Sequence, residues 1–335
     1  MTVEEHPFAA YVRILARGKT KSRPFTEEEA ETSMAMIMRG EVEPEQLGAY
    51  LMLIRFKEET AEEVAGFVRG ARLNLELPDS LPPLDLDWSS YAGKRRQLPW
   101  FLLSVLMLAG GGVRVFMHGT DGHTDGRVYT RATLEVLGLP VAGNLAEAAD
   151  HIENMNFAYV SLEDLQPRLQ EIIDLKPVLG LRSPAHTIGR MLNPFAAPYS
   201  MQGIFHRGFM DTHQKAGLLL GQSHMAVFRG EGGEIECRPN KTTDVRTVHD
   251  GKLGQEEWPR VLAGSPQAED EEMNIQRLVG VWTGEIDDEY AAAAVTGTAA
   301  IALKLMGKAS NFDEAQAMAE EMWQNRNRTW MGIAA

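Results

Sequence analysis

The chain has 335 residues, of which 44% are hydrophobic, and its one cysteine is Cys237. A chain of this length and apolar content can bury the core of one large domain or two. A single cysteine excludes an internal disulfide and is consistent with a reducing compartment. The net charge of −14 disfavours a general attraction to polyanions but leaves room for a local basic groove.

The amino-terminal segment MTVEEHPFAAYVRIL carries acidic residues where an export signal is basic, so we expect no export. No apolar run reaches the roughly 18 residues that span a bilayer. The nearest candidate, residues 98–109, is too short. The sequence therefore predicts a soluble, cytoplasmic protein that does not associate with membranes.

Residues 1 to about 75 read as four short helices. An apolar stripe over residues 8–15 predicts the first helix. Two Thr-x-x-Glu capping boxes, which begin at Thr26 and Thr60, predict where the second and fourth helices start. Pro44 fits the first turn of the third helix. We expect this bundle to bury one face against a second subunit, with purely internal packing as the alternative.

An α/β pattern follows the proline-rich linker of residues 75–85. The expected order is a loop, a helix, a strand, a second loop and a second helix, at residues 90–96, 98–109, 113–117, 118–122 and 128–137. This order is half of an open sheet, which binds ligands where loops leave the carboxyl ends of its strands. The two loops face one crevice if the strands are parallel.

The remaining chain alternates strands and helices and then becomes helical. A polar, irregular stretch is expected from residue 229 to about 266. The other predicted elements are strands at 156–162, 200–205 and 224–228, and helices at 165–175, 179–192, 207–220, 274–283, 288–306 and 313–326.

The loop Ser90-Tyr91-Ala92-Gly93-Lys94-Arg95-Arg96 combines a glycine with three basic residues. It suits a phosphate, whether of a small molecule or of a nucleic-acid backbone. A solvated surface loop is the equally weighted alternative. The patterns G-x-G-x-x-G and Gly-Lys-Ser/Thr are both absent, so no metal-bound nucleotide is implied. No catalytic residue and no metal-ligand spacing among histidines and Cys237 can be identified.

Two blocks, residues 39–72 and 179–195 (LGLRSPAHTIGRMLNPF), are similar to the anthranilate phosphoribosyltransferase family (glycosyl transferase family 3) and its pyrimidine nucleoside phosphorylase relatives. The resemblance continues through His118-Gly119, TLEVLGLP and GKAS and covers nearly the whole chain. It implies an α/β fold class: a small helical amino-terminal domain, residues 1–76, joined by helices near 182–198, and a larger α/β domain, residues 77–335, with a mixed central sheet. It also implies a dimer that packs through the helical domain.

The chain departs from the family where the family binds its substrate. The Gly-Thr-Gly-Gly-Asp loop that cradles pyrophosphate is replaced by Ser90–Arg95, which places bulky side chains where backbone should approach phosphate. The family's Lys-His-Gly-Asn becomes residues 117–120, and its acidic magnesium pair becomes Gly233-Glu234. Arg182 stays at the position that contacts the aromatic acid. These losses argue against ordinary anthranilate phosphoribosyl transfer.

The basic loop is similar to that of the YbiB-like branch, whose dimers bind nucleic acid irrespective of sequence. The resemblance leads us to expect a non-catalytic homodimer that binds single-stranded or double-stranded nucleic acid without a cofactor. The alternatives are a phosphoribosyl or glycosyl transferase with an unidentified acceptor, which binds phosphoribosyl pyrophosphate with Mg²⁺, and a binder of another phosphorylated ligand. The candidate nucleic-acid or phosphate-binding residues are Tyr91, Gly93, Lys94, Arg95, Arg96, His118, Gly119, Arg182, Arg207 and Lys215.

Overall fold

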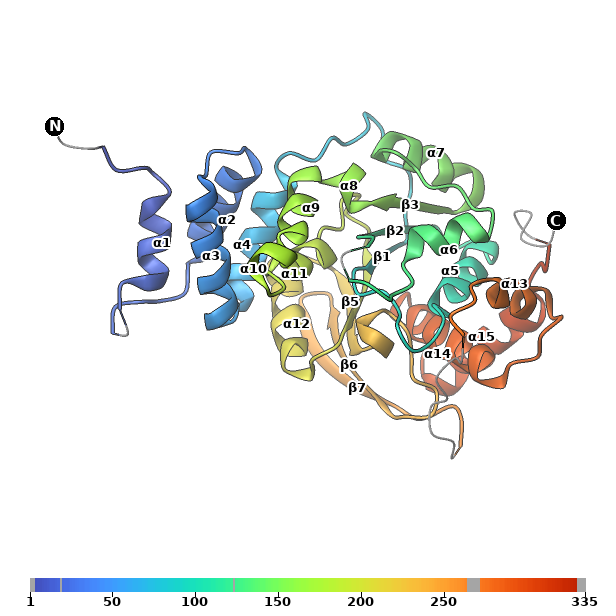
Figure 1. The fold of residues 1–335 in the computed structure, drawn as a ribbon. Helices are drawn as coiled ribbons and strands as arrows, with labels where there is room; N and C mark the ends of the chain where they lie inside the picture. The colour runs from blue at the N-terminus through green and yellow to red at the C-terminus, as the bar shows by residue number, and fades with distance from the viewer. Residues whose placement is uncertain (1–3, 19, 123, 264–271, 330–335) are drawn as a thin grey trace.

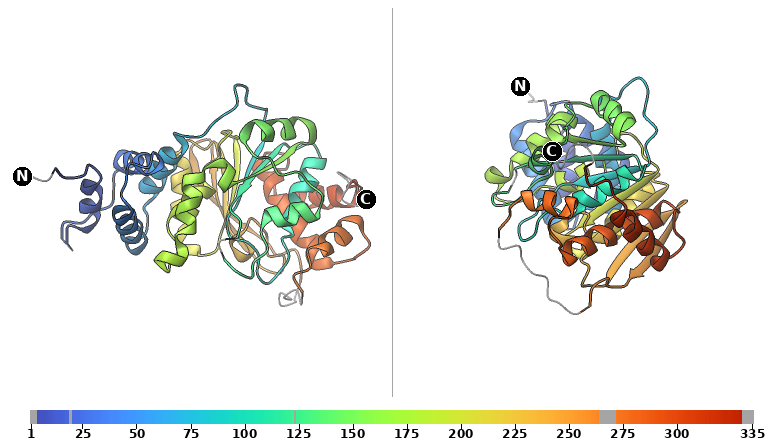
Figure 2. Two further views of the ribbon diagram at one scale, coloured as in Figure 1. Left: turned by 45° about the horizontal axis from the view of Figure 1, so that its top comes forward. Right: turned by 90° about the vertical axis from the view of Figure 1, so that its right-hand side faces the viewer.

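The computed structural model describes residues 4–18, 20–122, 124–263 and 272–329. A group of helices from the amino-terminal part lies at one end, and a sheet flanked by helices forms the rest (Figure 1). Figure 2 shows the amino-terminal helices projecting from one end, with the carboxyl-terminal helices at the other. Within the described ranges, no helix is both long and apolar enough to cross a bilayer.

The amino-terminal part forms the four predicted helices: α1 (Ala9–Ala16), α2 (Glu27–Met38), α3 (Pro44–Lys57) and α4 (Ala61–Arg72). Both capping boxes are confirmed, since Thr26 and Thr60 cap α2 and α4 through the N–H of the third residue beyond each. Aromatic rings hold the bundle together, with Tyr50 stacked 5.7 Å from Phe25 and hydrogen-bonded to Ser33 at 2.7 Å. The helical amino-terminal domain is therefore confirmed.

Seven strands form one mixed sheet in the order β3-β2-β1-β4-β5-β6-β7. The strands are β1 (Leu86–Ser90), β2 (Val115–Gly119), β3 (Phe157–Ser161), β4 (Tyr199–Ile204), β5 (His224–Arg229), β6 (Thr243–His249) and β7 (Lys252–Trp258). The first five strands in this order are parallel, and β6 and β7 pair antiparallel. The chain leaves β1 for β2 on one side and returns to β4 on the other. The carboxyl end of β1 is therefore a topological switch point, where open sheets bind ligands.

Helices cover both faces of this sheet. Along β2, Val115 and Met117 join one hydrophobic cluster, whereas Phe116 between them joins a second. The first cluster is covered by α5 (Phe101–Gly110), α6 (Thr130–Val136), α13 (Gln276–Thr283), α14 (Glu289–Leu305) and α15 (Phe312–Gln324). The second is covered by α7 (Leu145–Met155), α8 (Leu162–Leu165), α9 (Pro167–Asp174), α11 (Ala185–Arg190) and α12 (Met210–Leu219). Short turns of helix, α10 (Lys176–Leu179), η1 (Arg207–Phe209) and η2 (Glu231–Gly233), lie in the connections.

The helical region shares the second cluster and is tied to the α/β region by hydrogen bonds. Arg72 at the end of α4 donates to the carbonyls of Met191 and Leu192 at 2.9 and 2.6 Å. The segment after α11 thus contacts the amino-terminal helices, as the resemblance implies for helices near residues 182–198. The exact boundary at residue 76 stays a prediction.

Four elements of the structure were absent from the sequence prediction. Strand β1 and helix α7 were not expected, and residues 229–266, predicted as irregular, contain the β6–β7 hairpin. Asp250-Gly251 forms the hairpin turn with positive φ at both residues, 46° and 74°. An Asp-Gly pair between two extended runs is a hairpin signal that could have been used. The signal was weak because β7, at the edge of the sheet, is mostly polar and only Trp258 of its residues is buried.

Candidate functional site

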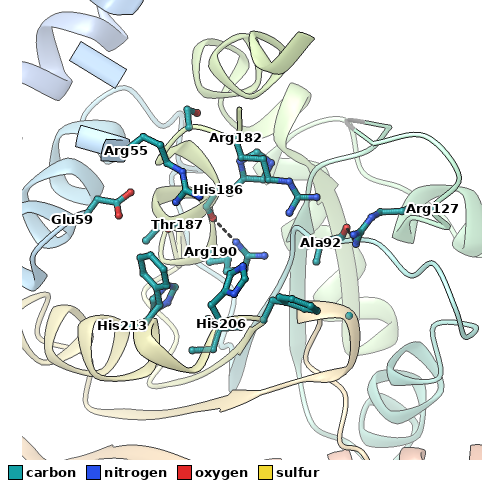
Figure 3. A pocket seen from close by; sticks show the side chains of 15 residues that line it. Arg55, Glu59, Ala92, Arg127, Arg182, His186, Thr187, Arg190, His206 and His213 are labelled. Atoms are coloured by element: carbon teal, nitrogen blue, oxygen red, sulfur yellow. Dashed lines mark hydrogen bonds between the residues drawn. The ribbon is translucent and has the colours of Figure 1, made fainter. Parts of the chain in front are cut away.

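A cavity of about 370 Å³ lies where the helical region meets the carboxyl ends of β1 and β4. Four arginines from separate parts of the chain line it: Arg55 at the end of α3, Arg127 in the loop after β2, Arg182 before α11 and Arg190 at the end of α11. Figure 3 shows them around one space, with Arg55 and Arg127 on opposite sides. We call this cavity the arginine pocket.

None of the four arginines forms an ion pair with a carboxylate in the part of the chain that the structure describes. Arg190 donates to the carbonyl of His186 at 3.0 Å, and Arg182 to Thr124 Oγ1 at 3.3 Å. Arg127 donates to the carbonyls of Ala92 and Gly93 at 2.9 and 3.0 Å. Carbonyls and hydroxyls satisfy hydrogen bonds but do not neutralise charge, so the pocket keeps a surplus of positive charge.

The pocket arginines also make one another's charged forms less favourable. Burial lowers the pKa of Arg182, and the nearby Arg127 and Arg55 lower it further. Burial likewise lowers the pKa of Arg190; the nearby Glu234 carboxylate opposes this shift, and Arg182 adds to it. Clustered cations that disfavour their own charged forms are stabilised by a bound anion, since it supplies the missing opposite charge.

The other lining groups leave this surplus in place. Glu59, the carboxylate that lines the pocket, is buried, and burial raises its pKa. His213 is buried with Nδ1 2.6 Å from Gln202 Oε1, and burial lowers its pKa to about 3, so the ring is neutral at physiological pH. Phe205 and Phe209 add apolar surface. The pocket therefore suits an anion with an apolar or planar part.

The loop after β1 borders the pocket through Ala92 and has a different arrangement of charge. The backbone N–H groups of Ala92 and Gly93 both donate to Oε1 of Glu234, each at 2.6 Å. The ammonium group of Lys94 pairs with Glu236, which also accepts the N–H of Phe101 at 2.9 Å, at the first turn of α5. Lys94, Glu234 and Glu236 are each exposed by 1% or less. Burial raises the pKa of Glu236 to about 7, and the Lys94 ammonium opposes this shift.

A second buried network lies beneath the loop. The Tyr91 hydroxyl is 2.8 Å from His118 Nδ1, and His118 Nε2 is 3.4 Å from Asp87 Oδ1. All three side chains are fully buried. The Tyr91 ring packs so closely on Gly189 that a Cβ there would lie 2.5 Å from it. This network joins the ends of β1 and β2 to α11, and its members do not reach the arginine pocket's surface.

The structure divides the predicted site residues into three groups. Arg182 lines the pocket. Tyr91, Gly93, Lys94, His118 and Gly119 are buried, so the alternative of a solvated surface loop is wrong for Lys94, whose charge is matched by Glu236. Arg95, Arg96, Arg207 and Lys215 are exposed. Arg207 pairs with Asp244 at 2.8 Å. None of these exposed residues lines the arginine pocket.

Sequence reasoning missed Arg55, Arg127, Arg190 and Glu236. One signal was available for Arg190, because it lies four residues after His186 and therefore on the same side of α11. Glu236 follows Glu234 by two residues, and in extended backbone this spacing directs both carboxylates to one side. Nothing in the sequence shows that Arg55 and Arg127 line the same cavity.

The fold defines a protein of two regions with a cavity between them, and comparisons with known proteins give its family. Residues 10–73 match the model of the glycosyl transferase family helical bundle domain, and residues 102–327 match that of its α/β domain. The chain belongs to this glycosyl transferase family, and the resemblance to the anthranilate phosphoribosyltransferase family is confirmed. Its place in the YbiB-like branch stays a prediction.

The similar proteins agree on the family and differ in name. The chain is 27% identical over 82% of its length to 84% of the anthranilate phosphoribosyltransferase of Thermomicrobium roseum. It is also 27% identical over 81% of its length to 86% of an uncharacterized protein of Aquifex aeolicus. One curated relative, an anthranilate phosphoribosyltransferase of Desulfitobacterium hafniense, is matched over 64% of its own length.

Solved structures show the same fold at low identity. Anthranilate phosphoribosyltransferase from Thermus thermophilus superimposes with a TM-score of 0.80 at 23% identity, with 98% of this chain and 99% of that one covered. The enzyme from Saccharomyces cerevisiae in complex with PRPP and Mg gives a TM-score of 0.79 at 16% identity, with 98% and 96% covered. At these identities the likeness establishes the fold alone.

The carboxylates of this chain do not fit a magnesium site. Glu234 and Glu236 contact the loop, and both accept hydrogen bonds from buried N–H groups. Glu236 is also neutralised by Lys94. In the described ranges, no three His, Cys, Asp or Glu side chains lie together as a metal ligand set. Mg²⁺ is usually held by one or two carboxylates together with substrate phosphates and waters, and here three of the four carboxylate oxygens of Glu234 and Glu236 already accept hydrogen bonds or an ion pair.

Proposed function

We propose that this chain is a phosphoribosyl- or glycosyl-transferase-type protein that binds a small anionic acceptor in the arginine pocket. The observation that carries the proposal is the group of four arginines that have no carboxylate partner in the described structure. An acceptor with a carboxylate or phosphate group and a planar, apolar part fits the arginines together with Phe205 and Phe209.

Ordinary anthranilate phosphoribosyl transfer is a poor fit. Its pyrophosphate leaving group requires open backbone N–H groups and metal ligands. In this chain Glu234 occupies the N–H groups of Ala92 and Gly93. The support from the relatives is accordingly for the transferase class and not for anthranilate as the acceptor.

Calorimetric titration tests the proposal. Anthranilate, ribose 5-phosphate and phosphoribosyl pyrophosphate, with and without Mg²⁺, are titrated into the wild type, Arg182→Gln and Lys215→Gln. The last is a matched control, because Lys215 is exposed on α12 and does not line the pocket. We expect at least one anion to bind the wild type and about 10- to 100-fold weaker binding to Arg182→Gln, the range for a lost hydrogen bond to a charged group. Equal affinities in the two variants would refute the pocket assignment.

Nucleic-acid binding is the second candidate, and one surface feature favours it. Arg229, Arg238, Lys241 and Arg260 line an open groove and form no ion pairs in the described structure. Arg229 lies 5.8 Å from the ring of Phe205, which is 53% exposed and also lines the arginine pocket. Cations beside an exposed ring suit single-stranded nucleic acid.

Labelled single-stranded DNA titrated at two salt concentrations tests nucleic-acid binding by this groove. Binding that weakens with salt and with Lys241→Gln supports it, and absence of binding refutes it.

A homodimer through the helical region is the expected assembly. Phe56 on α3 is 91% exposed and Val178 on α10 is 80% exposed. The two helices are neighbours, because a Cβ on Gly48 of α3 would lie 4.0 Å from Leu179 of α10. Large apolar side chains exposed on two neighbouring helices are typical of an interface. We expect Phe56→Asp to shift the mass measured by light scattering from dimer to monomer, whereas Lys215→Gln leaves it unchanged.

A further inference from the structure

We propose that Glu59 makes the arginine pocket selective for planar anions that also carry a neutral N–H donor. This role rests on the proposed function and narrows its ligand class. The arginines bind the anionic group of the ligand, and Glu59 accepts a hydrogen bond from a second group on the same molecule.

Glu59 is a buried carboxyl group that lines the arginine pocket and is 8% exposed. Its Oε2 is buried and has no hydrogen-bond partner. No ion pair joins it to Arg55 in the described structure, although both residues line the same cavity. Figure 3 shows its carboxyl group directed into the cavity, on the side away from Arg127. A buried acceptor without a donor is unfavourable, so a ligand that brings a donor is favoured there.

A second buried carboxylate, Glu63, lies four residues further on and shows the contrast. Its Oε1 accepts the backbone N–H of Phe25 at 2.8 Å. Its Oε2 accepts the N–H of Thr60 at 2.9 Å and pairs with Lys57 at 2.6 Å. Both oxygens of Glu63 therefore stabilise the fold, whereas no comparable bond holds the Oε2 of Glu59. Glu59 is the carboxyl group of this corner that is left for a ligand.

The backbone on both sides fixes the position of Glu59. Helix α3 ends at Glu58, whose φ of 63° is unusual for a residue other than glycine. Thr60, the next residue after Glu59, caps α4. Glu59 thus lies between two helix ends rather than in a long loop. Strained backbone at such a place is retained where the surrounding structure orients a functional side chain.

The charges of the pocket decide which donor fits. Burial raises the pKa of Glu59, and its own backbone N–H and Arg55 oppose the shift. A ligand ammonium group would be attracted by Glu59 but repelled by the four arginines that line the same cavity. A neutral N–H donor gains the hydrogen bond without this repulsion. Phe205 and Phe209 favour an aromatic ring as its carrier. The ligand class is therefore an aromatic ring with a ring N–H and an anionic substituent.

Two isosteric ring systems test this selectivity. Indole-2-carboxylate carries a ring N–H, and benzofuran-2-carboxylate has an oxygen in its place. The 5-carboxylates of both rings are titrated as well, so that the N–H lies either beside the carboxylate or across the ring from it. A site built around a donor rejects the analogue that lacks it, because its acceptor is left unpaired. We expect the wild type to bind an indole about 10- to 100-fold more tightly than the matching benzofuran, the range for a hydrogen bond to a charged group.

Three variants assign the preference to Glu59. Glu59→Leu removes the acceptor and Glu59→Gln keeps one amide oxygen. Glu58→Gln is the matched control, because Glu58 is exposed and does not line the pocket. Calorimetry should show that the preference falls to within about twofold in Glu59→Leu, through weaker binding of the indole, is smaller in Glu59→Gln and is unchanged in Glu58→Gln. If circular dichroism shows that Glu59→Leu does not fold, a reduced preference in Glu59→Gln gives the answer.

The remaining outcomes separate this role from the proposed function. Equal binding of indole and benzofuran by the wild type, with both weakened in Arg182→Gln, would refute the role of Glu59 and leave the pocket assignment standing. A preference that persists in Glu59→Leu would place the acceptor on another residue, and equal weakening of both compounds there would show a structural role. Binding of none of the four compounds would refute the ligand class. Anions that bind the wild type equally well in Arg182→Gln would instead refute the proposed function.

Discussion

The loop of residues 91–94 and the arginine pocket are neighbours that share Ala92, yet basic side chains are paired with carboxylates in the loop and not in the pocket. In the loop, Lys94 is paired with Glu236, and the free N–H groups are held by Glu234. In the pocket, Arg182 and Arg190 donate to a hydroxyl and a carbonyl, and neither forms an ion pair with a carboxylate in the described structure. A charged side chain with an internal partner stabilises the fold, whereas one without a partner is available to bind a ligand.

The difference shows that a basic sequence segment does not by itself mark a ligand site. Lys94 stands in the most basic run of the loop and is 1% exposed. Arg190 stands in an ordinary helical stretch and lines the pocket. What decides the role of each cation is whether the folded chain brings a carboxylate to it.

Removing Lys94 should have the largest effect on stability. Lys94→Met leaves the buried Glu236 without its counter-charge, so we expect the free energy of unfolding to fall by about 3–5 kcal/mol. Urea denaturation followed by circular dichroism measures the change. Adding Glu236→Gln should restore much of the loss, because the amide oxygen can still accept the Phe101 N–H. A loss below about 1 kcal/mol would show that the pair does not hold the loop.

Acid should weaken the protein through His213, to a smaller extent. The pKa of His213 is lowered to about 3 by burial, while the unfolded chain titrates near 6.5. Between these values the unfolded state binds the additional proton, so stability falls as pH decreases, by about 1.4 kcal/mol per unit. That slope is the limit well below pH 6.5, so urea denaturation at pH 6.5 and 5.5 should show a loss of about 1 kcal/mol in the wild type and a smaller loss in His213→Gln. Parallel slopes would contradict a neutral, buried histidine beside the arginines.

Arg182→Met should have the smallest effect on stability. No ion pair is lost, and repulsion from Arg127 and Arg55 is relieved. We expect the free energy of unfolding without ligand to change by less than about 1 kcal/mol, in contrast with Lys94→Met. The same urea titration checks this. A loss as large as that of Lys94→Met would mean that the pocket arginines are structural and would remove the contrast between the two regions.

Local patterns in the sequence predict most of the helices. The capping boxes at Thr26 and Thr60 and the apolar periodicity of the first four helices depend on residues within one or two turns. Strand β1 escaped prediction because Asp87, Ser89 and Ser90 are polar and yet fully or almost fully buried. Their burial comes from parallel neighbours on both sides of the strand, which local sequence does not encode.

The site was only partly predictable for the same reason. The sequence identified Arg182 through its resemblance to a family, whereas Arg95 and Arg96, which it also singled out, do not line the pocket. It could not show that Arg55, Arg127 and Arg190 line one cavity with Arg182. These three residues come from α3, the loop after β2 and α11, which only the folded chain brings together.

The sequence by itself determined the helical amino-terminal region, the α/β order and the loss of an open glycine cradle after β1. The tertiary structure alone decided which charges are paired. Lys94 finds its carboxylate 142 residues further along the chain, and Gly93 finds Glu234 at a separation of 141. Electrostatic and hydrogen-bonding energies depend on distance in space and on burial, and both are set by the packing of the whole chain.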